Sequence, residues 1–384
     1  MPNYKDRQSQ ISKSAFHVGR PNMPDKDLVI KRFSEVLENQ WLTNMGPSSL
    51  ELEEHICELL GVKHCVVVCN GTIGLELLQR ALDLNGEVII PAFTFVATAH
   101  SLRWQHIDPV FCDVKLDDHL IDPDKVEELI TPKTTGIMAV PIWGQPCANS
   151  KLQDLAYKYG LKLIYDSAHG FGCKDGDCHI GTFGDAEVFS FHATKVFSTG
   201  EGGAITTNSD KLAEKLRLMR NFGFTNLDRV DHIGTNAKMS EFAAAYGLAN
   251  LPQLDSIISH NKLIHQTYLE LFSGMPEISF LQYNFNGRSN YQYVVARVPK
   301  NKRDSLLSYF HRHDVLVRRY FFPGCHRMQP YLSEEKYIKV NLDNTETIAS
   351  EILIFPTGQQ MKTDDVSFIR DLYLKFTENV KNTP

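Results

Sequence analysis

The sequence predicts an α/β protein, in which a large domain with a mostly parallel sheet covered by helices on both faces precedes a smaller C-terminal α+β domain. Short apolar runs such as HCVVVC and LKLIYD alternate with segments of helical spacing. These runs are apolar at consecutive positions, which is typical of parallel strands buried on both faces. The alternation stops near residue 250. We therefore predict domains at 1–255, including an N-terminal arm, and 256–384.

Two helices are predicted before the first strand. Residues 28–42 carry apolar side chains at helical spacing, and the second helix ends at Gly61. Strands are then predicted at HCVVVC, GEVIIP, DPVFCDV, GIMAVPIW, LKLIYD, AEVFSF and GGAITT. Helices are predicted between several of these strands, at NGTIGLELLQRAL, FTFVATAHSLRW, 123–130, 149–159 and 210–220.

The C-terminal third has a different order of elements. A long helical segment is predicted over 236–272, followed by the strand YQYVVARV, a helix over 302–313, the strand LVRRYF and a helix over 364–380. Earlier in the chain, CKDGDCHIG is predicted to be a polar hairpin, because Gly and Asp favour turns. Its Cys173, Cys178 and His179 form the one Cys/His cluster of the sequence. No second cluster completes the four ligands of a structural zinc site, so we expect no metal.

The bulk composition excludes some classes of protein. The chain has 384 residues, 42% hydrophobic and 22% charged, with a net charge of −6 and no basic block. A dedicated nucleic-acid-binding protein is therefore not expected. The N-terminus has no apolar core of the signal-peptide kind, and no apolar run is long enough to span a membrane. We expect a cytoplasmic protein.

Polar residues follow three of the predicted strands, at the carboxyl ends where open α/β sheets bind their ligands. Asn70-Gly71-Thr72 opens a helix after HCVVVC, Asp166 ends LKLIYD, and Lys195 follows AEVFSF in a short turn before a glycine-rich stretch. Each has a simpler interpretation: the first as a helix cap, the second as a capping carboxylate, the third as a surface lysine.

Together, these three features match the requirements of pyridoxal phosphate (PLP). A helix N-terminus with small residues binds a phosphate, a carboxylate pairs with the protonated pyridine nitrogen, and a lysine holds the aldehyde carbon as a Schiff base. A nicotinamide enzyme would need G-x-G-x-x-G after its first strand, where this chain has NGTIG. A P-loop GKS or GKT is also absent from the sequence.

The segments AEVFSFHATKVFSTGEGGAITT, YDSAHGFG, CNGTIGL, PAFTFVAT and GTNAKMSEF resemble the DegT-type family of nucleotide-sugar aminotransferases over about residues 20–380. The resemblance implies the fold of aspartate aminotransferase, PLP fold type I. Within the family the chain is most similar to VioA-type enzymes, which aminate carbon-4 of dTDP-4-keto-6-deoxyglucose. Glutamate is the implied amino donor, and a homodimer with shared active sites is the implied assembly.

The resemblance also implies roles for single residues. Lys195 matches the Schiff-base lysine, Asp166 the partner of the pyridine nitrogen, and His169 the residue near the phenolic oxygen of PLP. The other cofactor-binding positions implied are Gly71, Thr72 and Ser190 at the phosphate, Phe95 stacked on the pyridine ring, and Asn236 reaching the phosphate of the neighbouring subunit. The substrate-binding positions implied are Trp143, where the family more often has tyrosine or phenylalanine, and Arg318, Arg319, Tyr320 and His326 of VRRYFFPGCHRMQPY, which would face the substrate diphosphate or the donor carboxylate.

Several alternatives stay open at this point. Phe93 and Phe95 could both be core residues, and His192 is interpreted as a packed histidine. Relatives that replace the lysine with histidine are dehydratases, and the presence of Lys195 favours transamination. The remaining hypotheses are amination at carbon-3 of a dTDP-3-keto-6-deoxyhexose, a PLP-binding regulator without turnover, and a PLP lyase acting on amino acids.

Overall fold

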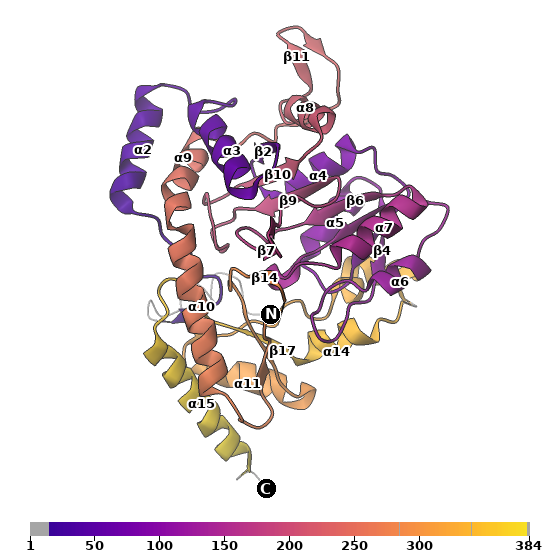
Figure 1. The fold of residues 1–384 in the computed structure, drawn as a ribbon. Helices are drawn as coiled ribbons and strands as arrows, with labels where there is room; N and C mark the ends of the chain where they lie inside the picture. Colours follow the sequence, from indigo (N-terminus) through magenta and orange to yellow (C-terminus); the bar gives the residue numbers. More distant parts are fainter. Residues whose placement is uncertain (1–14, 284, 339, 382–384) are drawn as a thin grey trace.

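The computed structural model describes residues 15–283, 285–338 and 340–381. The start of the first predicted domain, 1–14, and the end of the second, 382–384, lie outside the described residues. Its centre is a seven-stranded sheet in the order β2-β10-β9-β6-β5-β3-β4, seen in the upper half of Figure 1. The strands are β2 (His64–Val68), β3 (Glu87–Pro91), β4 (Asp108–Cys112), β5 (Thr134–Ala139), β6 (Lys162–Asp166), β9 (Ala186–Ser190) and β10 (Gly203–Thr207).

The sheet is parallel except at one strand, which confirms the predicted class. β10 pairs antiparallel with both β2 and β9, whereas the pairs β3–β4, β3–β5, β5–β6 and β6–β9 are parallel. A parallel neighbour requires a crossover connection, usually a helix, but no helix separates β9 from β10. The carboxyl ends of β2, β6 and β9 therefore lie at one edge of the sheet, together with the loop 191–202.

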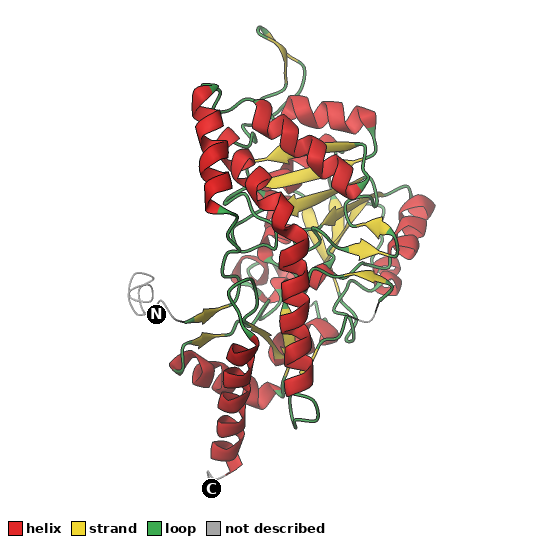
Figure 2. Ribbon diagram, turned by 60° about the vertical axis from the view of Figure 1, so that its left-hand side comes forward, coloured by secondary structure: helices red, strands yellow, loops and turns green. Residues whose placement is uncertain are grey.

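Helices cover both faces of the sheet, as Figure 2 shows. One face packs against α4 (Gly71–Ala81), α5 (Val96–Trp104) and α8 (Asp210–Met219), and the other against α3 (Pro47–Leu60), α6 (Pro123–Glu128), α7 (Asn149–Tyr159) and α9 (Glu241–Asn250). In β2, Val66 and Val68 contact the first layer while Cys65 and Val67 contact the second. This division explains why the strand is apolar at every position.

The C-terminal part has its own core around a three-stranded antiparallel sheet, β13-β15-β17. The long helix α10 (Leu254–Leu271) runs from the sheet-bearing part to this region (Figure 1). The remaining helices are α11 (Lys300–Arg312), α12 (Gln329–Leu332), α13 (Glu335–Ile338), α14 (Asp343–Glu351) and α15 (Thr363–Lys381). The remaining strands of this part are β13 (Ser279–Phe280), β14 (Gly287–Arg288), β15 (Val294–Arg297), β16 (Val315–Leu316) and β17 (Ile352–Phe355).

The N-terminal arm joins the two parts of the molecule. β1 (Phe16–His17) pairs in parallel with β16, and α2 (Lys26–Glu38) then packs beside α9. The domain boundary at 255 stays a prediction. The polar hairpin is confirmed, with β7 (Lys174–Asp175) antiparallel to β8 (Cys178–His179). A second hairpin, β11 (Phe224–Asn226) and β12 (Arg229–Val230), projects from the body at the top of Figure 1.

Three predicted boundaries are corrected. The segment 236–272 is not one helix: it becomes helical at Glu241 after the N-cap Ser240, and it is interrupted by the 3₁₀ turn η2 (Leu251–Gln253), which contains a proline. The first helix ends at Glu38, because Gln40 adopts a positive φ of 53°. Of LVRRYF only Leu316 lies in a strand, because β16 covers Val315–Leu316, and beyond it Arg318 forms a single bridge to Ile354.

Candidate active site

Asp166 ends β6 with its carboxylate buried. Its Oδ2 accepts a hydrogen bond from Thr98 Oγ1 at 2.7 Å, and its Oδ1 accepts one from the Ala168 N–H at 3.3 Å. Thr94 Oγ1 lies 2.8 Å from Thr98 Oγ1 and must be the donor there, because the Thr98 proton is directed at Asp166. Burial raises the pKa of Asp166, while the Thr98 hydrogen bond and the charge of Lys195 lower it. The hydroxyl chain thus favours the ionised carboxylate.

Lys195 lies in a tight turn just after β9, where its N–H donates to the His192 carbonyl at 2.9 Å. The side chain is half-buried. Burial lowers the pKa of Lys195 to about 8, and the carboxylate of Asp166 opposes that change. About a tenth of the amine is therefore neutral at pH 7, far more than for an ordinary lysine, and the neutral amine is the form that attacks a carbonyl group.

The start of α4 lies against the end of β9. Asn70 caps the helix by accepting a hydrogen bond from the Ile73 N–H at 2.8 Å. At Gly71 a side-chain carbon would come within 3.1 Å of Ser190 Cβ, so any larger residue would crowd Ser190. Thr72 is exposed and Ser190 is half-buried. The N-terminus of the helix, with its free N–H groups, therefore lies beside Ser190, and such a helix start is suited to a phosphate.

The two phenylalanines of PAFTFVAT have different environments. Phe93 is fully buried and belongs to the core. Phe95, at the start of the helix that carries Thr98, is 58% exposed, and its ring centroid lies 6.3 Å from that of Phe321. An exposed aromatic face beside Asp166's hydrogen-bond partner is available to stack on a planar ligand.

His169 is buried and held by hydrogen bonds at both ring nitrogens. Its Nδ1 accepts from the Trp143 backbone N–H at 3.3 Å, and its Nε2 lies 3.0 Å from the Tyr293 hydroxyl. Its ring stacks on Trp143 with centroids 5.9 Å apart. Burial, reinforced by the charge of Lys195, lowers the pKa of His169 well below its usual value, so the imidazole is neutral.

The five predicted substrate-binding residues do not share one accessible surface. Trp143 is fully buried: it stacks on Phe321 at 5.7 Å, and its indole N–H donates to His119 Nδ1 at 3.0 Å. Trp143 therefore supports His169 from behind rather than presenting an open face.

The other four lie further along the chain. His326 is fully buried, with its Nε2 3.3 Å from Glu346. Arg319 pairs with Asp304 at 3.1 Å. Arg318 is exposed, its guanidinium carbon 5.7 Å from the centroid of the half-buried Tyr320 ring. Arg318 and Arg319 are thus the exposed members of the set, and Tyr320 is half-buried.

Asn236 is exposed and lies close to the start of α4. Its neighbour Ala237 accepts a hydrogen bond from the Cys69 N–H at 2.8 Å, immediately before the helix cap. His192 is also exposed, and its Nδ1 lies 2.8 Å from Thr194 Oγ1. The interpretation of His192 as a packed histidine is therefore wrong: the side chain lies at the surface of the lysine turn.

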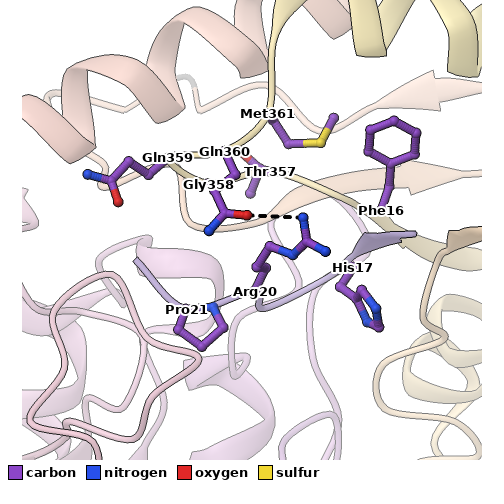
Figure 3. Close-up of a pocket in the computed structure, with 9 residues that line it drawn as sticks. All are labelled: Phe16, His17, Arg20, Pro21, Thr357, Gly358, Gln359, Gln360 and Met361. Carbon is purple, nitrogen blue, oxygen red and sulfur yellow. Dashed lines mark hydrogen bonds between the residues drawn. The ribbon is translucent and has the colours of Figure 1, made fainter. Parts of the chain in front are cut away.

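The sequence predicted an N-terminal arm but not its contact with the turn that carries Lys195. Asn22 is buried, its Nδ2 donates to the Val196 carbonyl at 3.3 Å, and its Oδ1 accepts from the Gln359 N–H at 3.0 Å. Beside it lies a cavity of about 30 Å³ between the arm and residues 357–361. Arg20 donates to Gln360 at 3.0 Å, the contact drawn as a dashed line in Figure 3. The arm is held in this position by hydrogen bonds to residues that are far away in the sequence.

Within 15–283, 285–338 and 340–381, no three His, Cys, Asp or Glu side chains are placed to share a metal ion. In the same part of the chain, no helix combines the length and the apolar character needed to cross a bilayer.

Comparisons with known proteins agree over nearly the whole chain. Residues 25–372 match the DegT/DnrJ/EryC1/StrS aminotransferase family. The dTDP-4-amino-4,6-dideoxy-D-glucose transaminase of Shigella dysenteriae is 38% identical over 355 residues, 92% of this chain and 96% of that protein. Its Escherichia coli namesake is 34% identical over 365 residues, 93% and 97% of the two chains. The structure of DesI in the presence of its TDP-sugar product has a TM-score of 0.90 and 40% identity, covering 94% of this chain and 93% of that one.

Proposed function

Because this chain belongs to the DegT/DnrJ/EryC1/StrS aminotransferase family, we propose that it transfers an amino group from glutamate to carbon-4 of dTDP-4-keto-6-deoxyglucose, with PLP as cofactor. The observation that carries the proposal is the meeting of Lys195, Asp166 and the start of α4 at one edge of the sheet. The choice of sugar is supported by the two transaminases named for the corresponding 4-amino sugar, which are 38% and 34% identical to this chain.

The residues at this edge fit PLP in size and chemistry. Lys195 would hold the aldehyde carbon and Asp166 the pyridine nitrogen, while Gly71, Thr72 and Ser190 would surround the phosphate. The close approach of Gly71 to Ser190 leaves backbone, and not side chain, at that point. The exposed ring of Phe95 would cover one face of the pyridine ring. Bound there, PLP withdraws electrons from the bond that is broken at the carbon bearing the amino group.

Each protein group has a task set by its surroundings. Lys195, with a pKa lowered to about 8, supplies a neutral amine that attacks a carbonyl and, once released, removes a proton from the donor's α-carbon. Burial raises the pKa of Asp166 and the Thr98 hydrogen bond opposes that rise, so Thr98 favours the carboxylate form that pairs with a cation. His169, whose pKa is lowered by burial, offers a neutral ring in a fixed orientation. Because donor and acceptor use the site in turn, ping-pong kinetics are expected.

The proposed assembly is a homodimer with shared active sites. The projecting hairpin supports a role in association, since it exposes Leu227 by 94% and Val230 by 53%, and Ile233 just beyond it by 78%. An isolated chain with apolar side chains at the tip of such a projection is unfavourable in water, and contact with a partner would bury them. Asn236, exposed beyond the same hairpin, is the residue proposed to reach the neighbouring cofactor.

A competition between two sugars tests the proposed substrate. The purified protein, loaded with PLP, would be given glutamate and equal concentrations of dTDP-4-keto-6-deoxyglucose and the 3-keto isomer. We expect the 4-keto sugar to be consumed first, with no turnover in a Lys195→Ala variant. Preferred consumption of the 3-keto sugar would assign the protein to the 3-aminotransferases instead. Full activity of Lys195→Ala would remove the basis of the proposal.

A further inference from the structure

The segment just before β15 reaches from the C-terminal part of the chain into the active site. Asn290 is fully buried, and its Nδ2 donates to the carbonyls of His169 at 2.8 Å and Phe171 at 3.0 Å. Its Oδ1 accepts from the Gln292 N–H at 3.0 Å. The loop that follows Asp166 is thus tied to a segment more than a hundred residues later, and this tie helps to orient Gln292 and Tyr293, two and three residues beyond Asn290.

Gln292 contacts the turn that carries Lys195. Its Nε2 donates to the Thr194 carbonyl at 2.9 Å. Since a carbonyl can only accept, the amide nitrogen must face Thr194, which also fixes the position of Oε1. That oxygen is buried and has no hydrogen-bond partner among the residues that the structure describes. Burying an unsatisfied carbonyl is unfavourable, so packing alone would be served better by an apolar side chain of the same length.

Tyr293 contacts the other functional side chain, His169. The Trp143 N–H donates to Nδ1 of the imidazole, so in the neutral ring Nε2 carries the proton and donates to the Tyr293 hydroxyl, 3.0 Å away. Gln292 Nε2 lies 3.3 Å from the same hydroxyl. The two rings lie with centroids 4.4 Å apart, and Tyr293 is buried. One connected set of hydrogen bonds therefore joins the lysine turn to the histidine.

We propose that Gln292 and Tyr293 are positioning residues, which fix Lys195 and His169 relative to each other through the Thr194 carbonyl and the imidazole Nε2. The inference rests on the proposed transamination for its kinetic consequence, but the geometry it assigns belongs to the protein without any ligand. The Trp143 N–H selects the tautomer of His169, and the C-terminal part of the chain holds the imidazole at Nε2 and orients the lysine turn. Displacing reacting groups by about 1 Å can cost a hundredfold in rate, so these contacts are expected to affect kcat.

The test uses Tyr293→Phe and Gln292→Met in the full-length protein, with Tyr268→Phe as matched control. Tyr268 is buried like Tyr293, but it lies in the core of the C-terminal part. Its hydroxyl donates to the Pro356 carbonyl at 3.1 Å. Without cofactor, ¹⁵N NMR of the imidazole groups should show His169 in a single Nε2–H tautomer in the native protein and the control. The Tyr293→Phe variant should keep this tautomer, which the Trp143 N–H selects, but its His169 Nε2 resonance should shift because the Nε2–H loses the Tyr293 hydroxyl as partner.

With cofactor and both substrates, each site variant should lose roughly tenfold or more in kcat while KM for the sugar changes less than about twofold. The double variant should lose less than the product of the two single losses, because both act in one network. The control should stay within about twofold of the native kcat. Unchanged His169 NMR in Tyr293→Phe, or native kcat in both site variants, would overturn the inference. If the protein aminated no sugar at all, the NMR result would still decide whether Tyr293 positions His169. If Tyr293→Phe did not fold, Gln292→Met would provide the kinetic test.

Discussion

The hydroxyl of Thr98 controls the ionisation of Asp166, and its removal is the most quantitative test of the site. Thr98 is fully buried and donates to Asp166 Oδ2 at 2.7 Å. Thr98→Val replaces the hydroxyl with a methyl group of nearly the same size. A hydrogen bond to an ionised group contributes about 1.5–3 kcal/mol, so ionisation of the carboxyl becomes roughly ten- to hundredfold less favourable.

The consequence is a change in pH dependence with a defined sign. Burial raises the pKa of Asp166, and loss of the Thr98 hydrogen bond, which lowers it, must raise the pKa further. Since the ionised carboxylate is the form that pairs with a protonated pyridine nitrogen, the acid limb of the activity profile should move to higher pH. Well above that limb, activity should return close to the native level.

Thr94→Val provides the matched control. Thr94 is equally buried and shares the hydroxyl chain, but it donates to Thr98 and makes no hydrogen bond to Asp166. The assay is kcat/KM for glutamate measured from acid to alkaline pH for the native protein and both variants, with thermal unfolding to verify folding. An acid limb in Thr98→Val that coincides with those of the native protein and of folded Thr94→Val would refute the reasoning.

Three other predictions concern buried charges. Burial raises the pKa of Glu187 to about 7 from 4.5, so the folded state keeps a proton that the unfolded chain has lost. The free energy of unfolding should therefore fall by roughly 3 kcal/mol between pH 4.5 and 7. In urea titrations Glu187→Gln should lack this decrease, and the same dependence of unfolding free energy on pH in the variant as in the native protein would contradict the prediction. Arg220 pairs with Glu53 at 2.5 Å in the core, so Arg220→Met should lose about 3–5 kcal/mol by chemical denaturation, whereas a loss below about 1 kcal/mol would show that the pair is dispensable. Because the pKa of Lys195 is lowered to about 8, the rate at which the cofactor-free protein reacts with PLP should level off near pH 8, and a rise that continues to pH 10 would show an ordinary lysine.

The sequence predicted those parts of the site in which a polar residue directly follows an apolar strand. Lys195 and Asp166 were found this way, because strand ends in one sheet converge irrespective of their separation along the chain. The direction of β10 could not be predicted from GGAITT, since residues of these types pair equally well in parallel and antiparallel strands. The missing helix between β9 and β10 was the available signal.

The supporting residues could not be predicted, because their roles depend on tertiary contacts. Gln292 and Tyr293 lie in YQYVVARV, which indicates a strand and gives no sign of a contact with Thr194 or His169. The opposite failure concerns Trp143, placed near the substrate on the evidence of its motif. Its side chain is fully buried, which no local pattern could reveal, because a large aromatic residue suits a core and a binding surface equally well.

The position of the transferred nitrogen tests the central claim most directly. The purified, PLP-loaded protein would be incubated with dTDP-4-keto-6-deoxyglucose and ¹⁵N-labelled glutamate, and the sugar product examined by NMR. The account predicts a single labelled product, dTDP-4-amino-4,6-dideoxyglucose, with ¹⁵N bonded to carbon-4, and none from Lys195→Ala. Nitrogen on carbon-3, or a folded, PLP-loaded protein that leaves this sugar unlabelled, would contradict it.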